Sequence, residues 1–356
     1  MGKLEKVYEK AQRVIESADV GGVKRDILTQ LVENEVKELE RIKEKVTTQE
    51  IDRIATIFLP AIKKIVRDSI VEEIVGVQPV KAGFPTAIVQ YIDYVYNSGD
   101  VAGKSAIDGP ITTDYSTSPG EGAQITKGID VVVRTKSADI KSRKLLSKWT
   151  LESQEAAEFM GVNLEKEITK ALGSKIVEEI NYEIINKLYT NASGAIAEWT
   201  KPSASDLPNV KDRKEKELFY TIEDVAHEIF NKTGRWPNFL IVNPSIASIL
   251  RRNGQYVSLG DRQNPRVSRL FVQGWLEDLG MKVHIVRSLQ TEDILVGWKG
   301  DSELEAGLIY APQTPFKIMD SFFNVETWEF LKSIGTSYAI AEVDFNIYGL
   351  VKVKSA

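Results

Sequence analysis

The stretch "LEKEITKALGSKIVEEINYEIINKLYT", residues 164–190, decides the architecture of this chain. Its aliphatic residues recur at every fourth position: Leu164, Ile168, Leu172, Ile176, Ile180, Ile184 and Leu188. Asn163 precedes the run and is a typical helix-capping residue. Because four residues turn an α-helix by about 400°, this aliphatic stripe advances by about 40° at each step. We therefore predict a long spine helix that is covered from different directions along its length.

Three segments on the amino-terminal side of the spine have clear local patterns. The stretch "TLESQEAAEFM", residues 150–160, predicts a short helix that Gly161 ends. Residues 86–96 and 129–143 are rich in β-branched or aromatic types, which predicts two strands. In the second strand, alternation should place one set of residues on one face and another on the opposite face: Ile129, Val131 and Val133 against Asp130 and Arg134.

The segment between these two strands, residues 97–128, is rich in Gly, Ser and Thr. A connection of this length without secondary structure is unusual within a compact domain. It is therefore either disordered or an extension that becomes ordered against a neighbouring molecule.

The first 75 residues are highly charged, and their apolar residues recur at helical spacing. We expect helices at about 3–18, 25–46 and 49–74, with a kink at Pro60. Such a region is either an arm that seeks partners or a small helical domain that packs on the rest of the chain. Its helical pattern ends at "VGVQP", residues 75–79, where the chain becomes extended.

On the carboxyl-terminal side, residues 191–217 predict a polar linker. The pattern then alternates over residues 218–320, which predicts a mixed α/β unit: helices at 221–231 with Thr221 as cap and at 244–252, and strands at 238–243, 282–287, 293–298 and 306–311. The final stretch "VDFNIYGLVKVK" predicts a terminal strand over 343–354.

Composition excludes several classes of function. The 356 residues carry a net charge of −5, which argues against a protein that coats nucleic acid through a basic face. Cysteine is absent, so disulfides, thiolate catalysis and cysteine-bound metals are excluded. No signal peptide or membrane span is evident, and we expect a soluble protein that is intracellular when it is made.

Motifs with possible chemistry are weak. The stretch "GDVAGKS", residues 99–105, resembles a phosphate-binding loop but has three residues between its glycines where four are needed. His227 and His284 are expected to be surface or satisfied histidines, and Glu178 and Glu179 to be solvated or ion-paired. The basic segment "RTKSADIKSRKLLSK", 134–148, either faces nucleic acid or is the exposed face of a long strand.

The order of these elements resembles the Hong Kong 97-type coat fold of the major capsid proteins of tailed bacteriophages and archaeal tailed viruses. The likeness is to the T-even phage branch, and it is carried by four stretches: "FLPAIKKIVRDSIVEEIVGVQP" (58–79), "KSRKLLSKWTLESQEAAEFMGVNLEKEITKALGSKIVEEINYEIINKL" (141–188), "VNPSIASILRRNG" (242–254) and "AGLIYAPQTPF" (306–316).

The resemblance implies an α+β fold in four parts. Residues 1–79 would be the N-terminal helical arm, and residues 80–217 a peripheral domain with the extended E-loop hairpin (97–128) and the spine helix (164–190). Residues 218–320 would be the axial α/β domain, and residues 321–356 the return strands of the peripheral domain.

The resemblance also implies a structural function. Copies of the chain would form the hexamers and pentamers of an icosahedral virus head around double-stranded DNA, bound without sequence specificity. Further partners would be a portal protein, a scaffolding protein, a prohead protease and decoration or vertex proteins. The protein would be made in the host cytoplasm and reside in the virion, without membrane, cofactor, metal or catalytic residues.

Two alternatives remain open at this point. An encapsulin-like shell that encloses cargo enzymes would share the fold. A mixed α/β enzyme would belong to a different class and would need a convergent polar site.

Overall fold

The computed structural model describes residues 30, 34, 70–81, 83–97, 128–203, 205–252, 256–257, 271–287, 289, 291–319 and 321–354. The predicted helix at 3–18, most of the predicted helices at 25–46 and 49–74, and the interior of the loop at 97–128 lie outside these residues. Within the described part, Gln30 and Asn34 are helical, and α5 (Val71–Ile74) leads into the body of the molecule.

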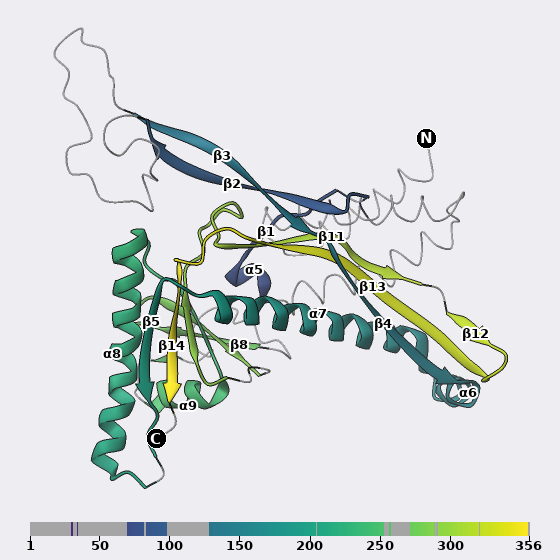
Figure 1. The fold of residues 1–356 in the computed structure, drawn as a ribbon. Helices are drawn as coiled ribbons and strands as arrows, with labels where there is room; N and C mark the ends of the chain where they lie inside the picture. Colours follow the sequence, from purple (N-terminus) through teal and green to yellow (C-terminus); the bar gives the residue numbers. More distant parts are fainter. Residues whose placement is uncertain are drawn as a thin grey trace.

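Three sheets make up the β structure of the described residues (Figure 1). A two-stranded hairpin consists of β2 (Thr86–Tyr96) and β3 (Ile129–Asp139). A five-stranded sheet contains β1 (Gly76–Val77), β4 (Lys141–Thr150), β11 (Leu308–Ile318), β12 (Phe322–Asn324) and β13 (Glu329–Glu342). A seven-stranded sheet has the order β5 (Ala195–Thr200), β14 (Tyr348–Lys354), β10 (Ile294–Gly297), β6 (Phe239–Val242), β9 (Met281–Val286), β8 (Phe271–Leu276) and β7 (Tyr256–Val257).

Four longer helices connect and cover these sheets in the described part: α6 (Leu151–Phe159), α7 (Leu164–Asn191), α8 (Pro208–Thr233) and α9 (Pro244–Arg252). Figure 1 shows α7 running beneath the long β4 and β13 strands toward the seven-stranded sheet. Helix α8 flanks that sheet, α6 lies at the far end of α7, and the β2–β3 hairpin projects away from the body.

The spine helix is present at the predicted place. The Asn163 side chain accepts a hydrogen bond from the Lys166 amide at 2.9 Å, and Gly161 has a φ of 70°, which a glycine adopts without strain. Of the predicted stripe, five residues are buried and the first two are half-buried: Leu172, Ile176, Ile180, Ile184 and Leu188, then Leu164 and Ile168.

The winding of this stripe explains how one helix joins two sheets. The buried residues of α7 share a core with Ile334 and Tyr338 of β13. The same core contains residues of the seven-stranded sheet, among them Phe239 and Leu295. Each end of the helix therefore packs on a different sheet, as the advancing stripe predicts.

Three local predictions were wrong. Residues 191–217 are not a linker, because β5 and the start of α8 occupy them. Thr221 is not a cap: α8 begins at Pro208, a favoured first helical residue, and the Thr221 hydroxyl bonds back to the Glu217 carbonyl at 2.8 Å. The strand predicted over 129–143 is two strands, β3 and β4, which are separated at Ile140.

The end of the chain also differs from its prediction. The last strand begins at residue 348, because residues 343 and 344 instead direct their amides to the Gly307 carbonyl. The two final strands go to different sheets, since β13 pairs with β4 and β11 whereas β14 pairs with β5 and β10. Residues 195–200 and 348–354 thus both lie in the seven-stranded sheet.

Candidate assembly site

The β2–β3 hairpin presents an apolar face. The register pairs Ile129 with Tyr96, Val131 with Tyr94, and Val133 with Ile92, so these side chains share one face of the ribbon. Ile129, Val131 and Val133 are 52%, 61% and 59% exposed. On the opposite face Arg134 pairs with Asp93 at 2.8 Å. The alternation predicted for residues 129–134 is therefore confirmed, and its β3 side chains on the apolar face are open to solvent, whereas Tyr96 opposite Ile129 is buried.

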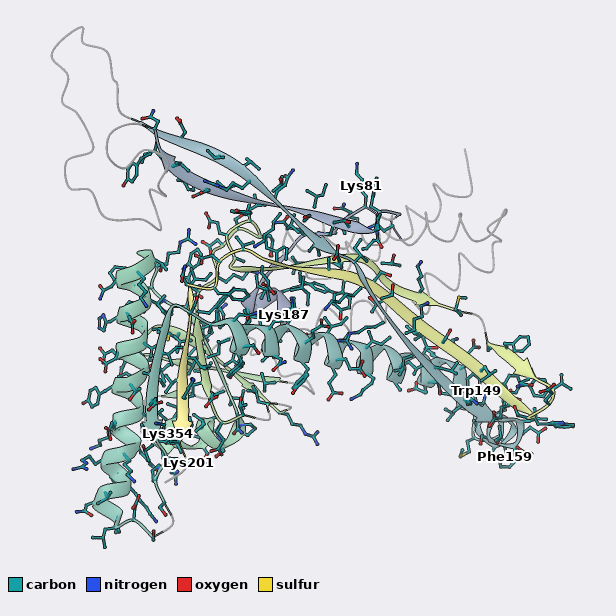
Figure 2. The ribbon with its side chains drawn as sticks, in the orientation of Figure 1. Lys81, Trp149, Phe159, Lys187, Lys201 and Lys354 are labelled. Carbon is teal, nitrogen blue, oxygen red and sulfur yellow. The ribbon has the colours of Figure 1, made fainter. Side chains whose placement is uncertain are left out.

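A second exposed apolar area lies at the far end of α7. It includes residues of the α6–α7 turn and of the β12–β13 hairpin: Phe159, Met160, Val162, Phe322, Val325 and Trp328. Phe159, labelled in Figure 2, is 96% exposed. Large apolar side chains exposed together at one end of a molecule can mark an interaction surface. We call these six residues the distal apolar end.

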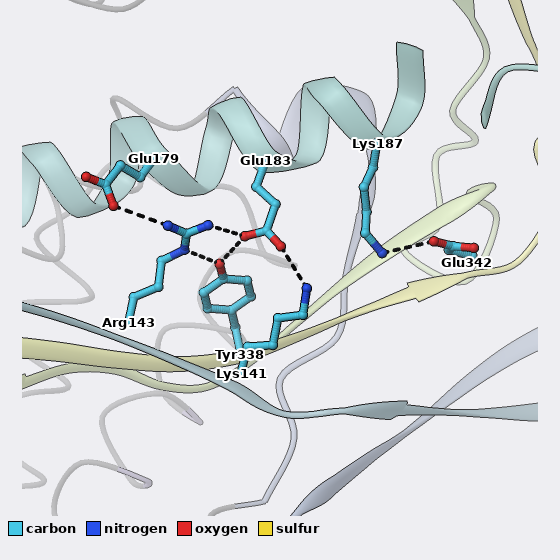
Figure 3. Close-up of polar contacts among 7 residues, drawn as sticks. All are labelled: Lys141, Arg143, Glu179, Glu183, Lys187, Tyr338 and Glu342. Carbon is cyan, nitrogen blue, oxygen red and sulfur yellow. Dashed lines mark hydrogen bonds and ion pairs between the residues drawn. The ribbon is translucent and has the colours of Figure 1, made fainter. Parts of the chain in front are cut away.

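The spine helix is fixed to the strands by a polar cluster (Figure 3). Arg143 of β4 binds Glu183 of α7 at 2.5 Å and Glu179 at 3.2 Å. The Tyr338 hydroxyl of β13 donates to the Glu183 carboxylate at 2.5 Å, and Lys141 binds its other oxygen at 3.1 Å. Two strands thus converge on one carboxylate in the middle of the helix, where Lys187 and Glu342 add a further link at 2.9 Å.

The cluster shifts the protonation equilibria of its members. Burial alone would raise the pKa of Glu183, but hydrogen bonds from Tyr338, Arg143 and Lys141 outweigh it and lower this pKa to about 2. Burial, with the hydrogen bond to Glu183, raises the pKa of Tyr338 to about 12. The carboxylate therefore stays charged and the phenol neutral across the whole physiological range.

Acid is expected to weaken this connection between helix and sheet. Because the pKa of Glu183 is lower in the folded chain than its ordinary value of 4.5, the group stabilises the fold above that value, and this contribution is lost as the pH falls toward 2. The loss should be about 2 kcal/mol, somewhat less than the full shift implies because the side chain is partly exposed. Urea melts of wild type and Glu183→Gln between pH 7 and 2.5 measure it.

The Glu183→Gln variant should be less stable than wild type at pH 7, and its stability should fall less steeply with acid. Glu178→Gln is the matched control, since Glu178 pairs with its own helical neighbour Lys175, at 3.2 Å, and not with the strands in the described part of the structure. Parallel pH profiles for wild type and Glu183→Gln would contradict the role assigned to the cluster.

Most basic side chains of the segment 134–148 form ion pairs with acidic residues of the same chain. Arg134, Lys141 and Arg143 make the contacts given above, and Lys148 lies 3.7 Å from Glu329. Of the two interpretations left open by the sequence, the structure thus favours a strand face that pairs with acidic neighbours over one that binds nucleic acid.

The other residues considered as possible sites lie in positions that suit a structural role. Glu178 and Glu179 are ion-paired with Lys175 and Arg143, as expected. His227 is exposed on α8 beside Glu223, and His284 is buried in β9 near the Phe239 ring. The "GDVAGKS" stretch lies outside the described residues.

The described residues contain no group of three or more His, Cys, Asp or Glu arranged to hold a metal ion. Among them there is also no helix long and apolar enough to cross a membrane.

Sequence reasoning missed two features of this region. The distal apolar end is built from two short turns whose apolar residues have no periodicity to distinguish them from core residues. The ion pair between Lys332 and Glu165, at 2.6 Å, joins β13 to the first turn of α7 across 167 positions of sequence. Lys332 is almost fully buried, which no local pattern indicates.

Comparisons with known proteins agree with the resemblance seen in the sequence. A family model described as "Major capsid protein Gp23" matches residues 111–355. The major capsid protein of Vibrio phage KVP40 is 27% identical over 197 residues, which cover 50% of this chain and 38% of that protein. That of Enterobacteria phage T6 is 26% identical over 194 residues, which cover 49% of this chain and 38% of that protein. The match thus spans well under half the length of these curated relatives.

Among solved structures, one of Microbacterium phage Oxtober96 aligns with 81% of this chain and 91% of its own, at 10% identity and a TM-score of 0.49. The described elements follow the order that the resemblance implies, from hairpin through spine helix and α/β unit to terminal strands. The predicted α+β class and the predicted order of its elements are therefore confirmed. Since the family model covers more than half of the sequence, the chain belongs to the family of the major capsid protein Gp23.

Proposed function

We propose that this chain is the coat subunit of a tailed-virus head, which assembles with copies of itself into hexamers and pentamers of an icosahedral shell around double-stranded DNA. The observation that carries the proposal is the projecting β2–β3 hairpin with its exposed apolar face. An isolated two-stranded ribbon is at best marginally stable in water. A neighbouring subunit would cover its apolar side and keep it in place.

The structure supports two functional units for such a subunit. One, the peripheral unit, comprises the hairpin, the five-stranded sheet and the spine helix α7. The other, the axial unit, comprises the seven-stranded sheet with α8 and α9, and includes β5 and β14. In this proposal the axial units meet at the centre of each capsomer. The hairpins and distal apolar ends would make the contacts around its periphery.

The remaining partners follow from a coat role. A head of this kind needs a portal protein, a scaffolding protein and decoration or vertex proteins, and a prohead protease where the subunit matures by cleavage. Packaged DNA would be enclosed without sequence readout, which suits a chain of net charge −5. Synthesis would take place in the host cytoplasm and the final location would be the virion.

Assembly is the direct test of this function. Concentrated protein, alone and co-expressed with a scaffolding protein, should give rings or shells by light scattering and electron microscopy. Purified shells should contain nucleic acid when made with the packaging proteins, whereas an encapsulin-like shell would contain a cargo enzyme. A species that stays monomeric under all these conditions would contradict the coat role and would reopen the enzyme alternative.

A further inference from the structure

The connection between β1 and β2 determines where the projecting hairpin points. It runs from Gln78 to Pro85, and Lys81 marks it at the base of the hairpin in Figure 2. It contains no helix or strand in its described residues, and Gly83 has a φ of 97°, a left-handed conformation that suits glycine. Its main-chain groups must therefore find hydrogen-bond partners outside regular structure.

Carboxamide side chains supply several of those partners. The Gln78 side chain accepts from the Gln90 amide at 3.1 Å and donates to the Gln90 carbonyl at 2.7 Å, so it occupies the edge of β2 as a neighbouring strand would. Gln313 of β11 is buried and donates to the carbonyls of Lys81 at 3.3 Å and Phe84 at 3.0 Å. Both glutamines hold the connection by bonds that carry no charge.

A third carboxamide comes from a distant part of the chain. Asn34 is 2% exposed, and its Nδ2 donates to the carbonyls of Val80 at 2.9 Å and Gln313 at 3.0 Å. Both N–H donors of the Asn34 side chain thus bond to carbonyls at the base of the hairpin. It connects an N-terminal residue to the hairpin base across 46 positions of sequence, and to β11 across 279.

We propose that Asn34, Gln78 and Gln313 form a carboxamide latch, which sets the direction of the β2–β3 hairpin and makes it depend on the two hydrogen bonds of Asn34. All three are positioning residues, because they act on the hairpin through the connection that carries it. The Asn34 side chain satisfies the carbonyls of Val80 and Gln313 by hydrogen bonds. If these contacts are lost, each carbonyl loses a hydrogen bond, and the connection from Gln78 to Pro85 can adopt another path.

Apolar packing at the hairpin base is the competing explanation for its direction. Ala87 and Val89 of β2 pack against Ile309 of β11 and Ala339 of β13. Four of the six buried residues of this core are alanines, and it is the smallest of the three cores described. Packing of this kind keeps the first residues of β2 near the sheet but constrains the direction of the hairpin little. Hydrogen bonds to defined carbonyls are directional and therefore constrain it more.

The latch has a consequence for assembly, which rests on the proposed function. If the hairpin contacts a neighbouring subunit, then its direction decides whether that contact fits. Loss of the two Asn34 hydrogen bonds would therefore change how the hairpin meets that neighbour.

Hydrogen exchange on the full-length chain tests the latch directly. Three amides report on the hairpin base: Val80 donates to the Pro312 carbonyl at 3.0 Å, Ile140 to the Pro85 carbonyl at 3.1 Å, and Gln90 to the Gln78 side chain at 3.1 Å. In Asn34→Ala these amides should exchange roughly tenfold faster than in wild type, as expected when a buried hydrogen bond is lost. Amides within α7 should be unchanged.

Asn186→Ala is the matched control, because Asn186 is an exposed asparagine on α7 and should leave all rates at their wild-type values. If Asn34→Ala proves poorly folded, Gln313→Met provides the second variant, since it keeps the volume and removes only the amide. Faster exchange confined to the hairpin base in either variant supports the latch. Wild-type rates at the three amides in a folded variant, or uniformly faster exchange throughout the chain, would overturn it.

Assembly of the same variants is measured separately, so that the two proposals can fail independently. A loosened hairpin in a variant that still forms particles would keep the latch and remove its consequence for assembly. Failure of wild type to form particles would contradict the coat role and leave the exchange result unaffected.

Discussion

Replacing residues 100–126 with a short Gly-Ser turn is expected to leave the subunit folded and to abolish particles. The segment joins two strands that are already paired at its ends, since the Asn97 amide donates to the Gly128 carbonyl at 3.1 Å and the Gly128 amide to the Asn97 side chain at 2.8 Å. Shortening the connection should therefore cost the monomer little, because closure entropy depends weakly on loop length. The loss of contacts with a neighbour would be repeated at every subunit of the shell.

Circular dichroism and thermal melts should show a wild-type subunit, while electron microscopy and light scattering should show no intact shells. A Gly-Ser segment of the original length is the matched control, because it separates loss of contacts from loss of reach. Unfolding of the shortened variant would place residues 100–126 in the subunit's own core. Normal particles that withstand heating as wild type does would show that the segment is a passive linker.

The second large effect is expected from Ile176→Asp in the middle of the spine helix. Ile176 is 1% exposed and lies in the core that α7 shares with both sheets. An unpaired charge buried at this position should cost about 3–5 kcal/mol, through desolvation and the loss of apolar burial. That is a large part of the stability of an ordinary domain, so the variant should be mostly unfolded at growth temperature.

Urea melts measure this cost, and Ala171→Asp provides the control on the exposed side of the same helix. The control introduces the same charge and a larger loss of helix propensity, and should still cost less than about 1 kcal/mol. Equal destabilisation by the two variants would mean that α7 has no buried side at Ile176, and the spine interpretation would be wrong.

Where a single element carries its own pattern, the sequence predicted it well. The strand at 86–96 has the predicted bounds, and the spine helix differs from its prediction by one residue at its end. The errors occurred where local signals were weak or misleading. The polar, lysine-rich first turns of α8 look like a linker, because only one side of that helix is apolar and its burial depends on the sheet beside it.

Much of the candidate assembly site could not be predicted for the same reason. The apolar alternation of β3 was visible in the sequence, but its exposure was not, since alternation alone cannot tell which face meets a core. The distal apolar end and the cluster around Glu183 bring together residues from separate elements. Arg143, Glu183 and Tyr338 are spread over 195 positions of sequence, and only the pairing of β4 with β13 above α7 places them in contact.

The sequence by itself determined the kinds and order of most elements, the winding of the spine and the family resemblance, because periodicity, capping residues and composition act over a few neighbouring residues. The tertiary structure decided which sheet received each strand, as with β13 and β14, and which polar groups met, as with Asn34 and the carbonyls of Val80 and Gln313. Those outcomes depend on long-range pairing, whose free energy comes from burying surfaces and satisfying main-chain groups together. The residues near a given segment therefore do not indicate which distant segment will cover it.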